Sequence, residues 1–347
     1  MNSTAIYLGN IEIFWSSILI TLGMIACLAL TLALYKPKNR STAVVWIFFP
    51  LAFFFSFIFS RVLHYYFNAE SYDSFFQAIT DYSVGSFVLP GMFLGIWLGA
   101  GIVRKCGLVS SSGQLLDFAA PGIILLIAFI RLSALFNDSC RSKIIVNLSL
   151  FQHLPVSVAS TDAAGNTTYR FATFFMEAIL LVILFLWILK FFFSGRKRKM
   201  CNPCPRSGNI FRIALVAYGM IEMITDSTRY DSPLMHFRII SYLNQYSAFI
   251  SLAQLFSAIA ALCVLIYYSR MSIKANGFSW KHPALWLLFI GSLIGIGYFG
   301  EYRVQRYGTQ KYFECYGIMA VSCILSFLSV YLLYRMCVYK DKERYEY

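Results

Sequence analysis

The chain has 347 residues, of which 59% are hydrophobic and only 13% are charged, and its net charge is +13. A soluble globular protein is about 45–50% apolar and about 25% charged, so this composition excludes a water-soluble globule and a disordered chain. It predicts an all-α polytopic membrane protein whose helices satisfy their own backbone hydrogen bonds.

Apolar runs of helical length divide the chain into nine predicted spans. In chain order they cover residues 12–35, 43–66, 84–103, 114–135, 171–193, 210–226, 247–268, 283–300 and 316–338. The sixth is the weakest, because it carries Glu222 and Asp226, and the eighth is short. The longest stretch that is not apolar is 137–170. No cleavable signal peptide is expected, because residues 1–11 lack a basic region and the first run is long enough to span.

The positive charge is distributed unevenly between alternate loops. One set of loops and the C-terminal end hold 19 of the 29 Lys and Arg residues and 3 acidic residues, so +16 lies on this side and −3 elsewhere. Cytoplasmic loops are enriched in Lys and Arg, so the pattern predicts an N-terminus outside and a C-terminus inside. The charge therefore reports topology rather than a nucleic-acid partner. The basic run at 196–199 is expected to contact anionic membrane lipid.

The nine cysteines are spread through the chain and predict neither a disulfide framework nor a metal site. Cys201 and Cys204 have the spacing of metal ligands, but a metal site needs about four ligands, and neither a second pair nor a histidine is near. We interpret this pair as two reduced thiols in a cytoplasmic turn.

Polar and ionisable residues within the spans and at their outer ends gather at a similar depth, in the outer half of the bilayer. They are Arg61 and His64 in the second span, Arg131 and Asn137 in the fourth, Arg170, Thr173 and Glu177 in the fifth, Tyr218, Glu222, Asp226 and Arg229 in the sixth, and Ser251, Gln254 and Ser257 in the seventh. Such residues are costly in a membrane and usually mark a functional site. The cluster predicts a polar pocket that opens toward the outer leaflet. The alternative is that these groups only pair with one another between helices.

Spacing along the sixth span places its polar residues on one face. Tyr218, Glu222 and Asp226 are four residues apart, and Arg229 follows three later. Buried guanidinium groups suit phosphate or carboxylate, because they offer planar, bidentate donors. Whether Glu222 pairs with Arg131 or with Arg229 is open. Outside the cluster, Asp117 lies one turn after the expected start of the fourth span, where it favours the dipole of its own helix.

Seven segments, in order, resemble motifs of the bacterial prolipoprotein diacylglyceryl transferase family. They are residues 60–68 with Tyr72, 85–95, 116–122, 131–139, 170–178, 218–231 and 251–257. The segment RLSALFNDS at 131–139 stands where the family has GRLGNFINGE, and YGMIEMITDSTRYD at 218–231 resembles YGLFRFLVEFFREPD. The match covers the first seven spans, which is the number expected for the family. It implies a seven-span core in residues 1–270, and two additional helices in 271–347.

The resemblance implies a reaction at the outer leaflet. The family transfers a diacylglyceryl group from phosphatidylglycerol to the lipobox cysteine of a secreted prolipoprotein, and glycerol phosphate is the leaving group. It thus implies these two partners, a multi-pass location in the bacterial cytoplasmic membrane and no cofactor. Cations must hold the phosphate, and a base must assist the thiol, because the thiolate is the nucleophile.

Residue roles follow from the same resemblance. The expected catalytic residues are Arg131, Tyr218, Asp226 and His64. The expected substrate-binding residues are Arg61, Asn137, Glu177, Glu222, Arg229 and Gln254. Arg131 and Arg61 are expected to hold the lipid phosphate, and Glu177 to orient an arginine. His64 is the only histidine in a predicted span and could serve as a displaced base, although such a histidine more often packs.

The sequence departs from the family at several positions. The family's histidine corresponds to Leu89, its first signature asparagine to Ala134 and its signature glutamate to Ser139. The arginine of YGLFRF is replaced by Glu222, which reverses the charge. These changes favour an alternative function, a paralogue that binds phospholipid or a precursor without turnover. A third possibility, a transporter with an ion relay, predicts charges at many depths or inverted repeats, and neither is seen.

Overall fold

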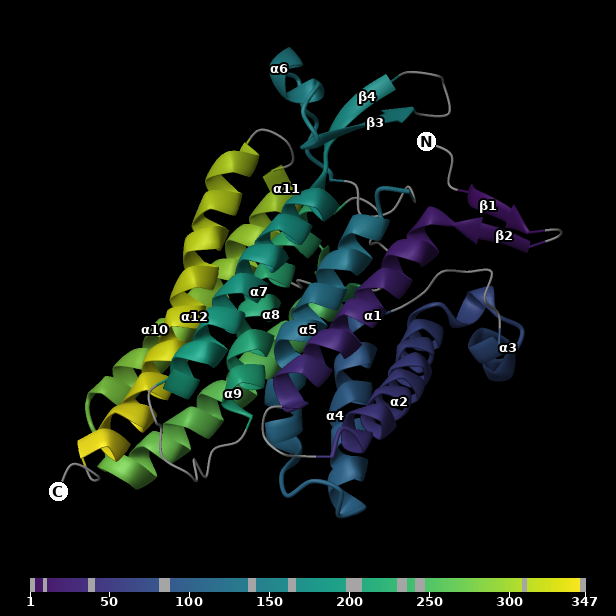
Figure 1. Cartoon of the computed structure of the whole chain (residues 1–347). Coiled ribbons are helices and arrows are strands. Elements are labelled where there is room, and N and C mark those ends of the chain that lie inside the picture. The colour runs from purple at the N-terminus through teal and green to yellow at the C-terminus, as the bar shows by residue number, and fades with distance from the viewer. Residues whose placement is uncertain are drawn as a thin grey trace. The chain divides into compact units, whose positions relative to one another are not determined.

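The computed structural model describes residues 4–8, 11–36, 41–80, 88–136, 142–161, 167–197, 208–229, 236–240, 247–307 and 311–343. A helix lies at each of the nine predicted spans (Figure 1). These helices are α1 (Trp15–Tyr35), α2 (Ala43–Phe67), α4 (Leu89–Lys105), α5 (Ser112–Ser133), α7 (Thr173–Lys197), α8 (Asn209–Thr228), α9 (Leu252–Asn276), α10 (Lys281–Ile296) and α12 (Tyr312–Glu343).

Within the described residues, seven helices are long and apolar enough to cross a membrane, and α10 is one of them when counted with its helical continuation, as Lys281–Arg306. The other two are α4, which has 17 residues, and α8, which carries Glu222 and Asp226. An all-α polytopic membrane protein is therefore confirmed. The predicted orientation, with the N-terminus outside, stays a prediction.

Shorter elements connect the long helices. They are the 3₁₀ turn η2 (Ala69–Ser71), the helices α3 (Phe75–Thr80), α6 (Ser149–Gln152) and α11 (Val304–Tyr307), and the π-helix η4 (Gly297–Arg303). Three antiparallel hairpins pair β1 (Thr4–Leu8) with β2 (Ile11–Phe14), β3 (Ser157–Thr161) with β4 (Thr167–Phe171), and β5 (His236–Ile240) with β6 (Ser247–Ser251).

The hairpins correct the starts of three predicted spans. The first begins at Trp15 rather than 12, the fifth at Thr173 rather than 171, and the seventh at Leu252 rather than 247. In each case the apolar residues before the helix belong to a strand, because a short apolar run suits either structure. The third span begins at Leu89, one residue before Pro90, which suits a first helical turn. Its predicted residues 84–87 lie outside the described part.

The eighth predicted span, 283–300, ends differently from the prediction. The α-helix α10 stops at Ile296 and continues as the π-helix η4 and then α11. Short stretches of π-helix inside α-helices are frequent at functional sites.

Contacts divide the chain into two compact units that are discontinuous in sequence. The first unit comprises Met1–Arg141, Phe174–Ala214 and Asp231–Met235. Within it α2 packs along α4, and α1 packs along α5. The α2–α4 crossing is very close, because a Cβ at Gly91 would lie 2.5 Å from the backbone nitrogen of Ser60. Ser60 donates its hydroxyl to the Val88 carbonyl, 3.0 Å away, and so closes the same crossing.

The second unit comprises Ser142–Thr173, Leu215–Tyr230 and His236–Tyr347. Within it α10 packs along α12, and α12 packs along α9 (Figure 1). Small polar residues let these helices approach, and the hydroxyls of Ser292 and Ser326 are 2.5 Å apart. His282 is buried where α10 begins and bonds to the Ser272 hydroxyl of α9 at 3.0 Å.

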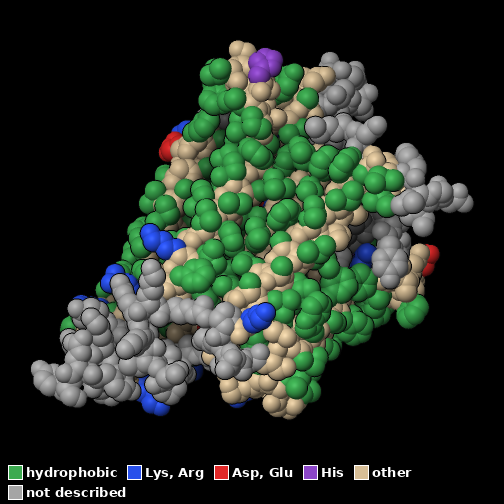
Figure 2. All heavy atoms as spheres, in the orientation of Figure 1, with side chains coloured by type: hydrophobic (Ala, Val, Ile, Leu, Met, Phe, Trp, Pro, Cys, Tyr) green, Lys and Arg blue, Asp and Glu red, His purple; other side chains and the backbone are tan. Residues whose placement is uncertain are grey.

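The outward surfaces of the helices are apolar, as a lipid environment requires. Trp97 is 64% exposed, Ile183 58% and Leu287 71%. Hydrophobic side chains dominate the face of the molecule shown in Figure 2. The buried polar residues are therefore unusual in a chain whose core and outward helix surfaces are mainly apolar.

Candidate functional site

Arg131 and Glu177 form a buried ion pair in the first unit. Arg131 lies in the last turn of α5 and Glu177 in the second turn of α7. Nε of Arg131 donates to Oε1 of Glu177 at 2.6 Å, and the two side chains are 9% and 0% exposed. In a medium of low dielectric, such a pair persists only with close geometry. The contact therefore places a guanidinium group in the interior, with its orientation determined by α7.

Arg61 is a second buried cation of this unit and is 4% exposed. It lies on α2 directly after Ser60, whose backbone touches Gly91 of α4. Its guanidinium carbon lies 5.6 Å from the centre of the Phe57 ring, one helical turn earlier, which is a cation–π distance. The close α2–α4 crossing therefore determines where Arg61 lies.

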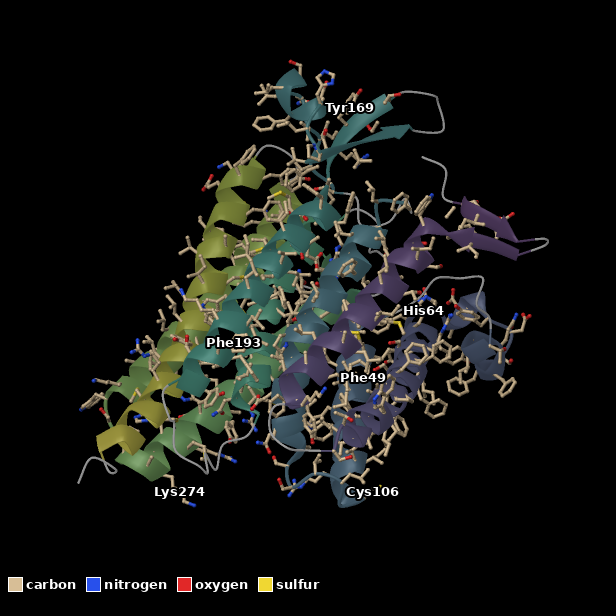
Figure 3. All side chains as sticks on the ribbon, viewed as in Figure 1. Phe49, His64, Cys106, Tyr169, Phe193 and Lys274 are labelled. Carbon is tan, nitrogen blue, oxygen red and sulfur yellow. The ribbon has the colours of Figure 1, made fainter. Side chains whose placement is uncertain are left out.

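His64 lies one turn further along α2 and is buried (Figure 3). Its Nδ1 is 3.1 Å from the hydroxyl of Tyr72, and the two rings meet edge to face. Asn68 donates to the His64 carbonyl at 3.0 Å and so closes the end of α2. The Nδ1 contact determines the orientation of the imidazole ring. This is compatible with both predicted roles of His64, a hydrogen-bonded packing residue and a positioned base.

The second unit holds a chain of hydrogen bonds along α8. Tyr218 donates to Oε2 of Glu222 at 2.9 Å, and Nη1 of Arg229 donates to Oε1 of Glu222 at 3.3 Å. The same nitrogen lies 3.2 Å from Oδ1 of Asp226. The face predicted from the spacing is therefore confirmed, and it joins one cation to two carboxylates. The open question about Glu222 has an answer in part, because Glu222 contacts Arg229.

Arg229 lies directly after α8 and is held there by backbone contacts. It forms an isolated β-bridge with Ser142, whose hydroxyl donates to the Thr228 carbonyl at 3.1 Å. The hydroxyls of Thr228 and Thr173 are 3.0 Å apart. These contacts anchor the end of α8 beside the first residue of α7.

The start of α9 faces the middle of α8. Ser251 and Gln254 form a reciprocal capping box at the N-terminus of α9. Nε2 of Gln254 donates to the Met223 carbonyl of α8 at 3.3 Å. One turn later Ser257 approaches Gly219, where an added Cβ would lie 3.1 Å from the serine Cβ. The capping box and the glycine together bring α9 against the polar part of α8.

Asp117 has a role that differs from the prediction. Its Oδ2 accepts from the Gly208 backbone N–H at 2.6 Å, and its Oδ1 accepts from Phe211 at 2.9 Å. Both donors belong to the start of α8, whereas the sequence indicated the dipole of Asp117's own helix. A carboxylate satisfies N-terminal N–H groups and favours the positive end of the dipole. Asp117 therefore caps the helix that carries Tyr218 and Glu222.

Some predicted residues lie elsewhere or outside the described part of the chain. Arg170 belongs to strand β4 rather than to a span, and its Nη1 donates to the Ser142 carbonyl at 3.3 Å. Asn137 lies outside the described residues. So do three of the cysteines, namely Cys140, Cys201 and Cys204.

Several residues that position the site could not be predicted from the sequence. Tyr72 was noted only as part of a motif, although its hydroxyl holds His64. Ser142 and Thr228 had no signal beyond being small polar residues near charged ones. Their contacts join segments 86 residues apart, and such pairing follows from packing rather than from a local pattern.

The two sets of residues offer complementary chemistry. Arg61 and Arg131 place guanidinium groups in the interior of the first unit, where hydrogen bonds to an anion are strong because the dielectric is low. In the second unit, Tyr218 is a hydroxyl donor, and Asp226 is a buried carboxylate. Guanidinium groups of this kind can bind phosphate, and a hydroxyl and a carboxylate can take part in proton transfer. That they face one pocket stays a prediction.

Comparison with known proteins identifies the family. A model described as prolipoprotein diacylglyceryl transferase matches residues 3–270. Phosphatidylglycerol–prolipoprotein diacylglyceryl transferase 1 of Clostridium perfringens (strain 13 / Type A) is 30% identical over 141 residues, which are 41% of this chain and 53% of that relative. The chain thus spans about half the length of this relative.

A second relative matches over a longer stretch. The phosphatidylglycerol–prolipoprotein diacylglyceryl transferase of Streptococcus agalactiae serotype Ia is 24% identical over 233 residues, which are 67% of this chain and 86% of that relative. The protein of serotype V of the same species matches equally. Because the family model covers most of the chain, the resemblance noted in the sequence is confirmed, and the chain belongs to the prolipoprotein diacylglyceryl transferase family.

Proposed function

We propose that the chain transfers a diacylglyceryl group from phosphatidylglycerol to the lipobox cysteine of a prolipoprotein. The observation that carries this proposal is the buried Arg131–Glu177 pair in a chain of this family. Buried guanidinium groups suit an anionic phosphate, and a membrane interior retains them only at a cost. The proposed location is the bacterial cytoplasmic membrane, with the pocket open toward the outer leaflet.

In the proposed reaction the cysteine sulfur attacks the glyceryl carbon that carries the phosphate. A carbon–sulfur bond forms, the carbon–oxygen bond breaks, and glycerol phosphate leaves with the electron pair. Arg131 and Arg61 hold the phosphate and stabilise the negative charge of the leaving group. The thiol proton passes to a base, because the thiolate is the nucleophile.

Two residues are proposed for the proton step. Asp226 is 4% exposed, and its Oδ2 is buried without a hydrogen-bond partner among the residues that the structure describes. A carboxylate oxygen of this kind can accept a proton or a hydrogen bond from the substrate. His64 is the second candidate, since Nδ1 faces the Tyr72 hydroxyl and the imidazole can carry a proton. Tyr218 is proposed as a catalytic or positioning donor.

The remaining residues are proposed to bind or orient substrate. They are Asn137, Glu177, Glu222, Arg229 and Gln254. Glu177 acts through Arg131, with which it pairs. Residues 1–270 are proposed to form the transferase core, and residues 271–347 to form an addition to it.

The contacts of Glu222 favour a second candidate function, binding without turnover. The family motif has an arginine at this position, and here the carboxylate engages Tyr218 and Arg229. A chain that keeps the phospholipid site but has altered catalytic groups would bind phosphatidylglycerol or a precursor without turnover. This alternative differs from the first only in the chemical step.

The test measures transfer directly. The purified full chain is placed in phosphatidylglycerol vesicles with a synthetic lipobox peptide, and the peptide mass is followed. The Arg131→Lys variant keeps the charge but loses the planar donors, so a fall in rate of about 10²-fold is expected. Arg335→Lys makes the same change at an exposed position of α12 and should leave the rate unchanged.

The same experiment separates the two functions. Phosphatidylglycerol that copurifies with the chain, together with an unmodified peptide, would support the binding protein and contradict the transferase. Rescue of a bacterial strain depleted of its own transferase would support the enzyme in cells. Equal rates for Arg131→Lys and the parent protein would remove Arg131 from the proposed mechanism.

A further inference from the structure

Helix α12 contacts the end of α8, although it lies beyond residues 3–270 that match the family. Tyr316, in the second turn of α12, donates its hydroxyl to the Ser227 carbonyl of α8 at 3.0 Å. Ser227 directly follows Asp226 and precedes Arg229 by two residues. The contact therefore reaches the backbone within the polar cluster of α8.

The carbonyls at the end of α8 show what this hydroxyl contributes. The last four carbonyls of an α-helix have no partner within the helix, and in a membrane each one needs another donor. Thr225 accepts from the Thr228 hydroxyl at 2.7 Å, and Asp226 accepts from the Arg229 N–H at 3.1 Å. Thr228 accepts from the Lys143 N–H at 2.8 Å. The Ser227 carbonyl accepts from the Tyr316 hydroxyl, which lies outside the matched region.

A second contact of the same kind reaches the strand before α9. The Gln305 side chain, in α11, accepts from the Phe249 N–H at 3.0 Å and donates to the Phe249 carbonyl at 2.8 Å. Phe249 is the middle residue of β6, a strand of a two-stranded sheet. The amide thereby occupies the place that a further strand would take at this edge. Strand β6 ends at Ser251, which is the N-cap of α9.

Both contacts therefore act on elements that carry site residues. Tyr316 holds the end of α8, next to Asp226 and Arg229, and Gln305 holds the strand that leads to Gln254. The π-helix η4 lies between α10 and α11 and changes the helical path just before Gln305. The ring of Tyr316 also packs against Tyr312 at a centroid distance of 5.8 Å.

We propose that Tyr316 and Gln305 are positioning residues, through which the two additional helices hold Asp226, Arg229 and Gln254 in the geometry that the reaction needs. This inference rests on the proposed transferase function for its kinetic readout. It assigns the residues after 270 a part in the site, where the family resemblance assigned them none. Small misplacements matter, because a shift of about 1 Å can cost about 10²-fold in rate.

The test compares matched variants of the full chain in phosphatidylglycerol vesicles. Tyr316→Phe removes only the hydroxyl, and Gln305→Leu removes both hydrogen bonds to Phe249. Tyr312→Phe is the control, since it makes the same change one turn earlier on α12. Gln305→Glu keeps the acceptor for the Phe249 N–H and loses the donor, so it should rescue part of the effect of Gln305→Leu.

For each variant kcat and KM for the lipobox peptide, the unfolding temperature and amide hydrogen exchange are measured. We expect kcat to fall about 10-fold in Tyr316→Phe and Gln305→Leu, with unchanged KM and unfolding temperature. Exchange should rise at 225–229 in the first variant and at 247–254 in the second. Unchanged kcat in both, or a fall that only matches lost folded protein, would overturn the inference.

Hydrogen exchange also separates this inference from the proposed function. If the parent protein shows no transfer at all, the transferase proposal fails and the exchange data alone decide. Faster exchange confined to the named segments would then retain the positioning role, and unchanged exchange would refute it.

Discussion

Glu177 shows what the membrane interior demands of a single residue. Its side chain is fully buried and lies 2.6 Å from Arg131. An isolated charge at this place would cost several kcal/mol, so each partner makes the other tolerable. Apolar residues of similar volume in place of such a pair would often leave the protein as stable. The buried pair is therefore weak evidence of a contribution to stability and better evidence that one of its charges is needed for function.

Replacing one partner of this pair should therefore be costly. Glu177→Gln keeps the shape but leaves the Arg131 charge without its carboxylate, and we expect a loss of about 3 kcal/mol in the free energy of unfolding. Thermal or denaturant unfolding of the purified protein measures it.

The matched control is the double variant Glu177→Gln with Arg131→Met, which removes both charges. It should recover most of the lost stability. A single variant as stable as the parent would show that the pair contributes little to burial of the arginine.

Helix α8 is the element on which most of the polar cluster depends. Its N-terminus is capped by Asp117, and its C-terminal carbonyls each have a partner. Helix α8 is mostly apolar but carries Glu222 and Asp226. These two acidic residues lower the gain from placing the helix in a membrane. The contacts at its two ends therefore matter more than they would in a helix of uniform apolar surface.

The cap on α8 leads to a prediction for Asp117. Asp117→Ala leaves the N–H groups of Gly208 and Phe211 without their acceptor, and we expect a loss of about 1–3 kcal/mol in stability. Amide hydrogen exchange at these two residues should accelerate. Asp117→Asn retains one carbonyl acceptor and should lose clearly less. Equal stability of the parent and Asp117→Ala would contradict the cap.

The α2–α4 crossing leads to a prediction at the same scale. A Cβ at Gly95 would collide with the Ser56 backbone, whereas Gly101 of the same helix has open space. Gly95→Ala should therefore separate the helices and cost about 1–3 kcal/mol or more. Since Arg61 lies on this crossing, transfer activity should fall as well.

Gly101→Ala is the matched control for this crossing. It should be neutral or stabilising by about 0.5–1 kcal/mol, because alanine is the better helix former. Unfolding temperatures of the two variants measure the difference, and equal values would show that the crossing has room for a methyl group.

At the scale of the whole molecule, the main feature is the uneven distribution of charged residues along the chain. Long apolar helices leave the basic residues in alternate loops, and that asymmetry predicts the orientation. Orientation bears on function, because the proposed substrates would be met at the outer leaflet.

Reporter fusions to the full chain test this orientation. A fluorescent protein that matures only in the cytoplasm should be active at the C-terminus, and a phosphatase that needs export should be inactive there. The reverse pattern would overturn the predicted topology and the outward-facing pocket with it. A reporter fused after residue 161, between β3 and β4, should give the opposite result to the C-terminal fusion.

Much of the fold was predictable because hydropathy and helical period are local properties. The positions of nine helices and the shared face of Tyr218, Glu222 and Asp226 follow from spacing alone. The hairpins were not predicted, since a strand such as β6, Ser247–Ser251, has too few residues to be told from the start of a helix.

The sequence by itself determined that the chain lies in a membrane, where its helices run and which family motifs it keeps. Only the tertiary structure decided the partners, namely Glu177 for Arg131, Arg229 for Glu222, and the start of α8 for Asp117. It also joined Tyr316 to Ser227, 89 residues away in the chain. The physical reason is that a buried polar group must find a partner, while the choice among partners depends on how helices distant in sequence pack together.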